Sequence, residues 1–187
     1  VEKKRKFVCV DTNDIPEIAV VDPDMMSSMP KGLTAATGMD ALTHAIEGYI
    51  TKGHCTISDM FHLEAIKLIS ENLRGAVQNT PEGREGMALG QYIAGMGFSN
   101  VGLGIVHSMA HKTGAAFADY GAHIIHGAAN AMYLPKVIAF NAKDPEAKKR
   151  YGVIADEMKL GGANDDEKVG LLIEYLRGMN DALNIPH

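Results

Sequence analysis

The sequence changes character at residues 27–32, and this change sets the fold class that the chain can adopt. Before it, residues 6–10 (KFVCV) and 17–21 (EIAVV) are rich in β-branched side chains and are separated by turn formers. After it, apolar residues recur at helical spacing almost to the end of the chain. The pattern predicts a mainly α chain preceded by two short strands. These strands would belong to a larger sheet outside the chain, because an isolated strand pair is marginally stable in water.

Turn-forming residues divide the helical part into separate helices, and Gly53, Pro81 and the Gly161–Gly162 pair mark clear breaks. The predicted helices span residues 34–50, 56–77, 82–98, 104–116, 128–140, 145–158 and 165–183. The third of these contains Gly86, Gly90, Gly95 and Gly97, which weaken a helix unless they permit close packing. We therefore expect that helix to lie close to a neighbour.

Composition excludes several classes of function. The chain has 18 basic and 23 acidic side chains, with a net charge of −5, which argues against nucleic acid as a partner. No apolar run approaches the roughly 20 residues that cross a bilayer, and the N-terminus does not resemble a signal peptide. Cys9 and Cys55 are far apart, so neither a disulfide framework nor a zinc ribbon is indicated. We expect a cytoplasmic protein without a membrane partner.

Residues 99–130 contain His107, His111, His123 and His126, which are four of the eight histidines in the chain. His107 and His111 are four residues apart in an otherwise small and apolar segment, so they would share one face of a helix. A buried histidine must be hydrogen-bonded or must bind a metal. Both readings, a metal site and a pair of hydrogen-bonded core histidines, are open from these residues alone.

An upstream pair completes a possible metal site. Asp40 and His44, in TGMDALTHAIEGY, also stand four residues apart, although such a pair is weak evidence by itself. Our hypothesis is a divalent metal held by Asp40, His44, His107 and His126, with open coordination for a substrate oxygen. One carboxylate and three imidazoles leave a divalent ion net positive, so it remains a Lewis acid. A structural zinc site would more often use cysteine.

We assign no binding or catalytic role to the other candidate motifs. Residues 102–107 (GLGIVH) do not match a dinucleotide fingerprint, because the sixth position is histidine and no strand precedes them. We interpret Glu47 and Glu64 as solvated or helix-pairing charges. His54 and His62 have no motif partner and are assigned no function.

Three segments, TGMDALTHAIEGY, MALGQYIAGMGFSNVGLGIVHSMAH and HGAANAMYLP, resemble the iron-dependent (group III) alcohol dehydrogenase family. The resemblance covers nearly the whole chain and is greatest for the lactaldehyde reductase (1,2-propanediol oxidoreductase) branch. It implies a dehydroquinate-synthase-like helical metal-binding domain that follows an α/β domain binding NAD(P). Residues 1–26 would end the nucleotide-binding domain, and residues 27–187 would be the helical catalytic domain, incomplete at its C-terminus.

The resemblance implies roles for individual residues. The family's metal ligands fall on the four residues of the hypothesis above, and His111 corresponds to a further histidine beside the nicotinamide and substrate. Lys6 resembles a residue near the cofactor. Residues 118–122 correspond to an insertion relative to the family. If the insertion is placed differently, His123 replaces His126 as the ligand.

The function implied is hydride transfer between NAD(P) and a small alcohol, diol or aldehyde, with Fe²⁺, or Zn²⁺ in its place, as the metal. The complete enzyme would be a homo-oligomer, and we expect the isolated chain to be inactive. An alternative is a catalytically silent helical module that at most binds metal. A metal-dependent hydrolase is a third reading, but it requires a general-base carboxylate beside the metal, and no HExxH motif is present.

Overall fold

The structure is a computed structural model, and it describes residues 9, 11–117 and 124–186. Within these ranges two short 3₁₀ helices, η1 (Thr12–Asp14) and η2 (Pro23–Met26), precede the α-helices. The α-helices are α1 (Lys31–Ile50), α2 (Thr56–Val77), α3 (Pro81–Val101), α4 (Ile105–Ala116), α5 (His126–Asn141), α6 (Pro145–Glu157) and α7 (Asp165–Ala182). All the predicted helices are confirmed, with boundaries within three residues of those expected.

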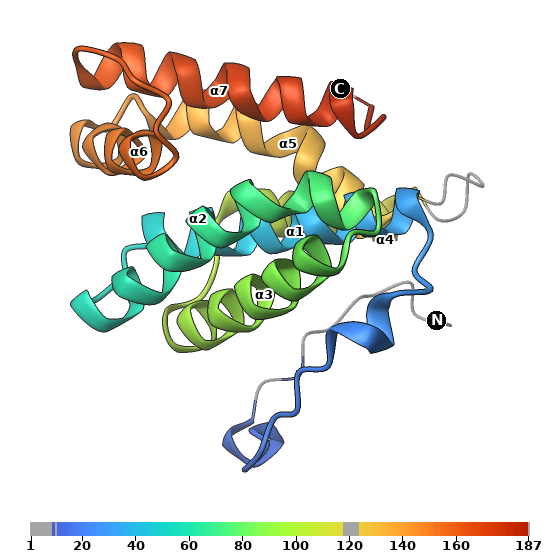
Figure 1. Cartoon of the computed structure of the whole chain (residues 1–187). Helices are drawn as coiled ribbons and strands as arrows, with labels where there is room; N and C mark the ends of the chain where they lie inside the picture. The colour runs from blue at the N-terminus through green and yellow to red at the C-terminus, as the bar shows by residue number, and fades with distance from the viewer. Residues whose placement is uncertain (1–8, 10, 118–123, 187) are drawn as a thin grey trace.

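Helix α1 lies at the centre of the molecule and contacts α2, α3, α5 and α6. Figure 1 shows α5 and α7 on one side of it and α3 on the other. Met39, Leu42 and Ile46 are completely buried, and small or apolar residues occupy its other faces as well. A helix that is apolar nearly all round is buried by its neighbours. Polar side chains on the buried faces of α1 are therefore held in place by the neighbouring helices.

The glycines of α3 permit the close packing that the sequence predicted at three of four positions. A Cβ atom at Gly90 would lie 2.8 Å from Cγ1 of Ile69 on α2, and Gly86 and Gly97 face side chains of α2 at similarly short range. Gly95 has open space around it, so the prediction is wrong there. The close approach of α3 to α2 brings the C-terminal end of α3 beside α1.

The predicted N-terminal strands are not seen, and the residues that the structure describes contain no β-strand. Ile18 is 83% and Val20 is 88% exposed in the segment 17–21, which extends away from the helices in Figure 1. A strand requires a hydrogen-bonding partner strand, and this segment has none among the described residues. Apart from Cys9, the first predicted strand (6–10) lies outside the described residues. The division at residue 26 stays a prediction.

No helix among the described residues combines the length and apolarity that crossing a bilayer requires.

Candidate metal centre

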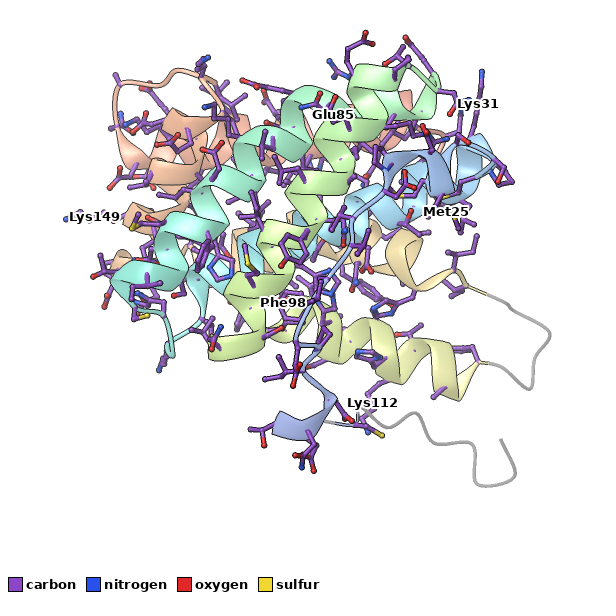
Figure 2. The ribbon with its side chains drawn as sticks, turned by 60° about the horizontal axis from the view of Figure 1, so that its bottom comes forward. Met25, Lys31, Glu85, Phe98, Lys112 and Lys149 are labelled. Carbon is purple, nitrogen blue, oxygen red and sulfur yellow. The ribbon has the colours of Figure 1, made fainter. Side chains whose placement is uncertain are left out.

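The site begins on one face of α1, where Asp40 and His44 lie one turn apart. Asp40 Oδ2 is 4.0 Å from His44 Nδ1, and both side chains are about one-fifth exposed. The His44 ring stacks on Phe98 of α3, with ring centroids 4.5 Å apart and planes inclined by 13°. Phe98 is labelled in Figure 2, at the end of α3. Stacking on this ring limits rotation of His44, so its nitrogen is held toward Asp40.

Helix α4 brings His107 to the same carboxylate. His107 is buried, and its Nε2 lies 3.5 Å from Asp40 Oδ1. Its ring centroid is 4.3 Å from that of His44. Asp40, His44 and His107 each place one potential ligand atom within 4.8 Å of the others, which is a group able to hold a metal ion. His107 follows Asp40 by 67 residues and His44 by 63, so two distant segments are joined at one point.

The first residue of α5, His126, lies beside this group, although it is not one of the three residues whose ligand atoms all lie within 4.8 Å of one another. Its Nε2 lies 3.6 Å from Asp40 Oδ1, and the ring is 5.5 Å from that of His107. One turn later, the Asn130 amide nitrogen contacts both Asp40 Oδ1 and His126 Nε2, the latter at 3.2 Å. A Cβ atom at Gly127 would collide with the α1 backbone. This glycine therefore lets the start of α5 reach the site.

His111 lies on α4 one turn after His107, at the edge of the cluster. Its ring stacks on that of His126, with centroids 4.6 Å apart, and lies 6.3 Å from that of His107. The described structure thus places His111 beside His126, between α4 and the start of α5. Lys6 and His123 lie outside the described residues, so their predicted roles stay predictions.

Sequence reasoning missed Glu47. It was interpreted as a solvated or helix-pairing charge, but the structure shows it only 6% exposed, with its carboxylate against α4. Glu47 Oε2 is 2.7 Å from His107 Nδ1. Glu47 lies one turn before the end of α1 and seven residues after Asp40, so it shares the face of α1 that carries the cluster. That seven-residue spacing was the only available signal. Glu64, in contrast, is half exposed as expected.

The charges in the cluster suit a cation. Burial disfavours an ionised Asp40, but contact with the His107 imidazole and the charges of His44 and His126 outweigh it and hold the pKa of this carboxyl below its usual range. Burial, opposed by Asp40 and reinforced by His107, lowers the pKa of His44 to about 4. The cluster therefore offers an ionised carboxylate and a neutral imidazole near neutral pH. These are the protonation states that metal binding requires.

The pKa of His107 shifts in the opposite direction. Burial lowers its pKa, but the carboxylates of Asp40 and Glu47 raise it more, so the net shift is upward. The buried Nε2 of His107 has no hydrogen-bond partner among the described residues. A buried, unsatisfied imidazole nitrogen facing a carboxylate is a position that a metal ion would satisfy.

A cavity of about 970 Å³ borders the other side of Glu47 and does not contain the cluster. It is lined by residues of α1, α5, α6 and the loop before α4, among them Ile50, Val137 and Phe140. None of the predicted metal ligands lines it. The metal cluster and this cavity are separate features of the described structure.

Residues 34–187 match the model of the Fe-containing alcohol dehydrogenase family, C-terminal region. The chain belongs to this family. Among curated members it is 49% identical over 185 residues to lactaldehyde reductase of Escherichia coli K12, a match that covers 99% of this chain and 47% of the relative. It is 46% identical over 181 residues to the NADPH-dependent butanol dehydrogenase of Clostridium saccharobutylicum, covering 97% of this chain and 45% of that one.

Solved structures of family members agree with the fold. The iron-containing alcohol dehydrogenase of Thermococcus thioreducens superposes with a TM-score of 0.84 at 34% identity, covering 95% of this chain and 44% of that one. A 1,3-propanediol oxidoreductase gives a TM-score of 0.80 at 38% identity, covering 88% and 42%. The chain spans about half the length of the curated relatives it matches. The family resemblance stated from the sequence is confirmed, and these relatives bear the names of oxidoreductases.

The donor set fits the metal for which the Fe-containing family is named. Imidazole and carboxylate ligands suit Fe²⁺, Zn²⁺ and other divalent ions, and the cluster offers one carboxylate with imidazole nitrogens around it. Residues 102–104, rejected above as a dinucleotide fingerprint, form the loop between α3 and α4 and follow a helix, not a strand. That rejection is confirmed.

Proposed function

We propose that the chain is the metal-binding part of an alcohol dehydrogenase that uses Fe²⁺ and NAD(P) to interconvert a small alcohol or diol and its aldehyde. The observation that carries the proposal is the convergence of imidazoles from α1, α4 and α5 on one carboxylate. Asp40, His44, His107 and His126 are the proposed ligands. Zn²⁺ could take the place of iron, because the same donors suit it.

A divalent cation held by these residues would polarise a substrate oxygen as a Lewis acid. The chain's own contribution is to hold the donors and to exclude water on the buried side, where His107 and Glu47 lie. We assign His111 the transfer of a proton at the edge of the site, because it lies one turn after His107 on α4 and its ring stacks on that of His126. Lys6 stays our candidate for a contact with the cofactor.

The names of relatives support the substrate class. They include lactaldehyde reductase of Escherichia coli and 1,3-propanediol dehydrogenase of Klebsiella pneumoniae, which is 45% identical over 142 residues. Both names refer to small hydroxylated compounds, so we propose a short diol or hydroxyaldehyde as substrate. A homo-oligomeric complete enzyme and a cytoplasmic location stay predictions.

The structure offers no support for the hydrolase alternative. A hydrolase needs a carboxylate free to act as a general base beside the metal. Glu47 is the nearby carboxylate outside the proposed ligands, and both its oxygens already accept hydrogen bonds from α4. A catalytically silent metal-binding module remains the alternative to be tested.

Two measurements test the proposal. The first is the metal content of the chain after anaerobic loading with Fe²⁺ or Zn²⁺, for which we expect one ion per chain, lost in His107→Ala. The second is hydride transfer with NADH and NADPH after the chain is joined to the remaining segments of E. coli lactaldehyde reductase. We expect turnover of small aldehydes by the joined protein, none by the chain alone, and retained metal with reduced turnover in His111→Ala. A joined, metal-loaded protein without turnover would favour the silent module.

A further inference from the structure

Helix α4 begins without a capping side chain of its own. Its N-cap residue is Gly104, and its first turn contains no acidic residue. The first N–H groups of a helix have no partner within the helix, and a buried helix start must satisfy them elsewhere. Glu47 of α1 does so: its Oε1 accepts from Val106 N at 2.7 Å, and its Oε2 accepts from His107 N at 3.1 Å. A residue 60 positions away in the sequence thus caps α4.

The same carboxylate also binds the His107 ring. Glu47 Oε2 lies 2.7 Å from His107 Nδ1. Because an ionised carboxylate only accepts hydrogen bonds, Nδ1 must carry the proton in this contact. The lone pair of the neutral ring is then on Nε2, the atom that lies 3.5 Å from Asp40 Oδ1. One oxygen therefore binds both the backbone and the ring of His107, which restricts the ring to a single orientation.

Gly104 makes this arrangement possible. A Cβ atom at Gly104 would lie 2.7 Å from Glu47 Oε1, closer than nonbonded atoms approach. A side chain at this position would displace the carboxylate while leaving all four proposed ligands unchanged. The loop before α4 is therefore shaped around Glu47.

From this geometry we propose that Glu47 is the positioning residue of the metal centre: it selects the Nδ1–H tautomer of His107 and aims Nε2 at the metal position. The inference rests on the proposed function for its metal, but the tautomer and the cap are properties of the metal-free chain. Carboxylates bound to a ligand histidine in this way typically change metal affinity about 10- to 100-fold when removed.

The first test needs no variant. ¹⁵N NMR of the histidine rings in the metal-free chain, recorded at increasing pH until the ring signals no longer change, reports which nitrogen of the neutral imidazole carries the proton. We expect the Nδ1–H form for His107. An Nε2–H form would overturn the proposal, whether or not the chain binds metal.

The second test compares metal affinities by competition titration with Zn²⁺. We expect Glu47→Gln to bind about 10- to 100-fold more weakly than the unaltered chain. Gly104→Ala should weaken binding in the same direction, since it displaces Glu47 without removing it. Glu64→Gln, at a half-exposed position on α2, is the matched control and should bind as the unaltered chain does.

Folding of each variant is checked by circular dichroism, so that a lost site is not confused with a lost fold. Unaltered affinity in folded Glu47→Gln or in folded Gly104→Ala would overturn the proposal, as would an equal loss in Glu64→Gln. Should Glu47→Gln fail to fold, Gly104→Ala and the tautomer of the unaltered chain decide the question. Failure of the unaltered chain to bind Zn²⁺ or Fe²⁺ would count against the proposed function, and the tautomer alone would then decide this inference.

Discussion

Two clusters on the helical core each combine an aspartate with histidine, yet only one is suited to a metal. In the first, Asp40 faces His44, His107 and His126. In the second, Asp59 of α2 faces His54 at 3.4 Å. Both contain an aspartate and a histidine within five residues of each other, so local spacing does not separate them.

The two clusters differ in the group that faces the aspartate carboxylate. Arg150 of α6 places Nη2 2.6 Å from Asp59 Oδ1, so the second carboxylate is neutralised by the protein itself. Arg150 also donates to the Tyr49 carbonyl and lies over the Tyr49 ring at 3.9 Å. The ion pairs that the structure describes for Asp40 are all with imidazoles. A carboxylate that faces imidazoles can share a metal cation with them, whereas one paired with arginine stabilises the contact of two helices.

The largest expected effect is on metal affinity, and it separates Asp40→Ala from Asp59→Ala. Asp40→Ala removes the only carboxylate among the proposed ligands, and we expect metal affinity to fall more than about 100-fold, beyond the range for removing a supporting residue. Asp59→Ala should leave the metal affinity unchanged. Metal content and a Zn²⁺ competition titration measure both. Equal losses in the two variants would contradict the distinction drawn here.

Metal addition should stabilise the fold through the first cluster only. At a free metal concentration about 100 times Kd, a ligand bound only by the folded chain adds about 2.7 kcal/mol to the free energy of unfolding. Urea unfolding with and without Zn²⁺ measures the increment. We expect it in Asp59→Ala and not in Asp40→Ala. Stabilisation of Asp40→Ala by the metal would indicate a different site.

The second cluster should contribute to stability without metal. Arg150→Met removes charge-assisted hydrogen bonds and the contact with the Tyr49 ring, and we expect a loss of about 2 kcal/mol in the free energy of unfolding. Urea unfolding of the metal-free chain gives this value. Lys159→Met, which removes an exposed side chain 4.0 Å from Glu71, is the control and should change stability little. Weakened metal binding in folded Arg150→Met would show that the second cluster also affects the metal site, against the distinction drawn here.

A further prediction concerns His62, which belongs to neither cluster. It is completely buried, and burial lowers its pKa to about 4. The unfolded chain takes up this proton below about pH 6.5 and the folded chain does not. Stability is therefore lost as pH falls from about 6.5 to 4, by at most about 1.4 kcal/mol per pH unit for this group.

The variant His62→Gln removes this titration. We expect a shallower decline of the free energy of unfolding between about pH 6.5 and pH 4, with the remainder due to groups such as His44, whose pKa is also lowered to about 4. Urea unfolding at a series of pH values measures it. An unchanged slope would show that His62 is not the titrating group.

Most of the helical architecture could be predicted from local patterns. Periodic apolar residues and turn formers located the helices from α1 to α7, because such signals act within a few residues of the chain. The strand prediction at residues 17–21 is wrong, because β-branched composition expresses a preference that only a partner strand can satisfy. His62 illustrates another limit: its burial between α1 and α3 depends on Gly48 and Gly97, and neither is near it in the sequence.

The sequence by itself determined the family and the helical fold, and it nominated the donor residues, since their types and spacings are local properties. Only the tertiary structure decided that Asp40 meets imidazoles while Asp59 meets Arg150, because these partners come from different helices. It also decided the position of Glu47, which contacts His107 although the two residues are 60 positions apart in the chain. Long-range contacts of this kind arise from packing around α1, and no local pattern encodes them.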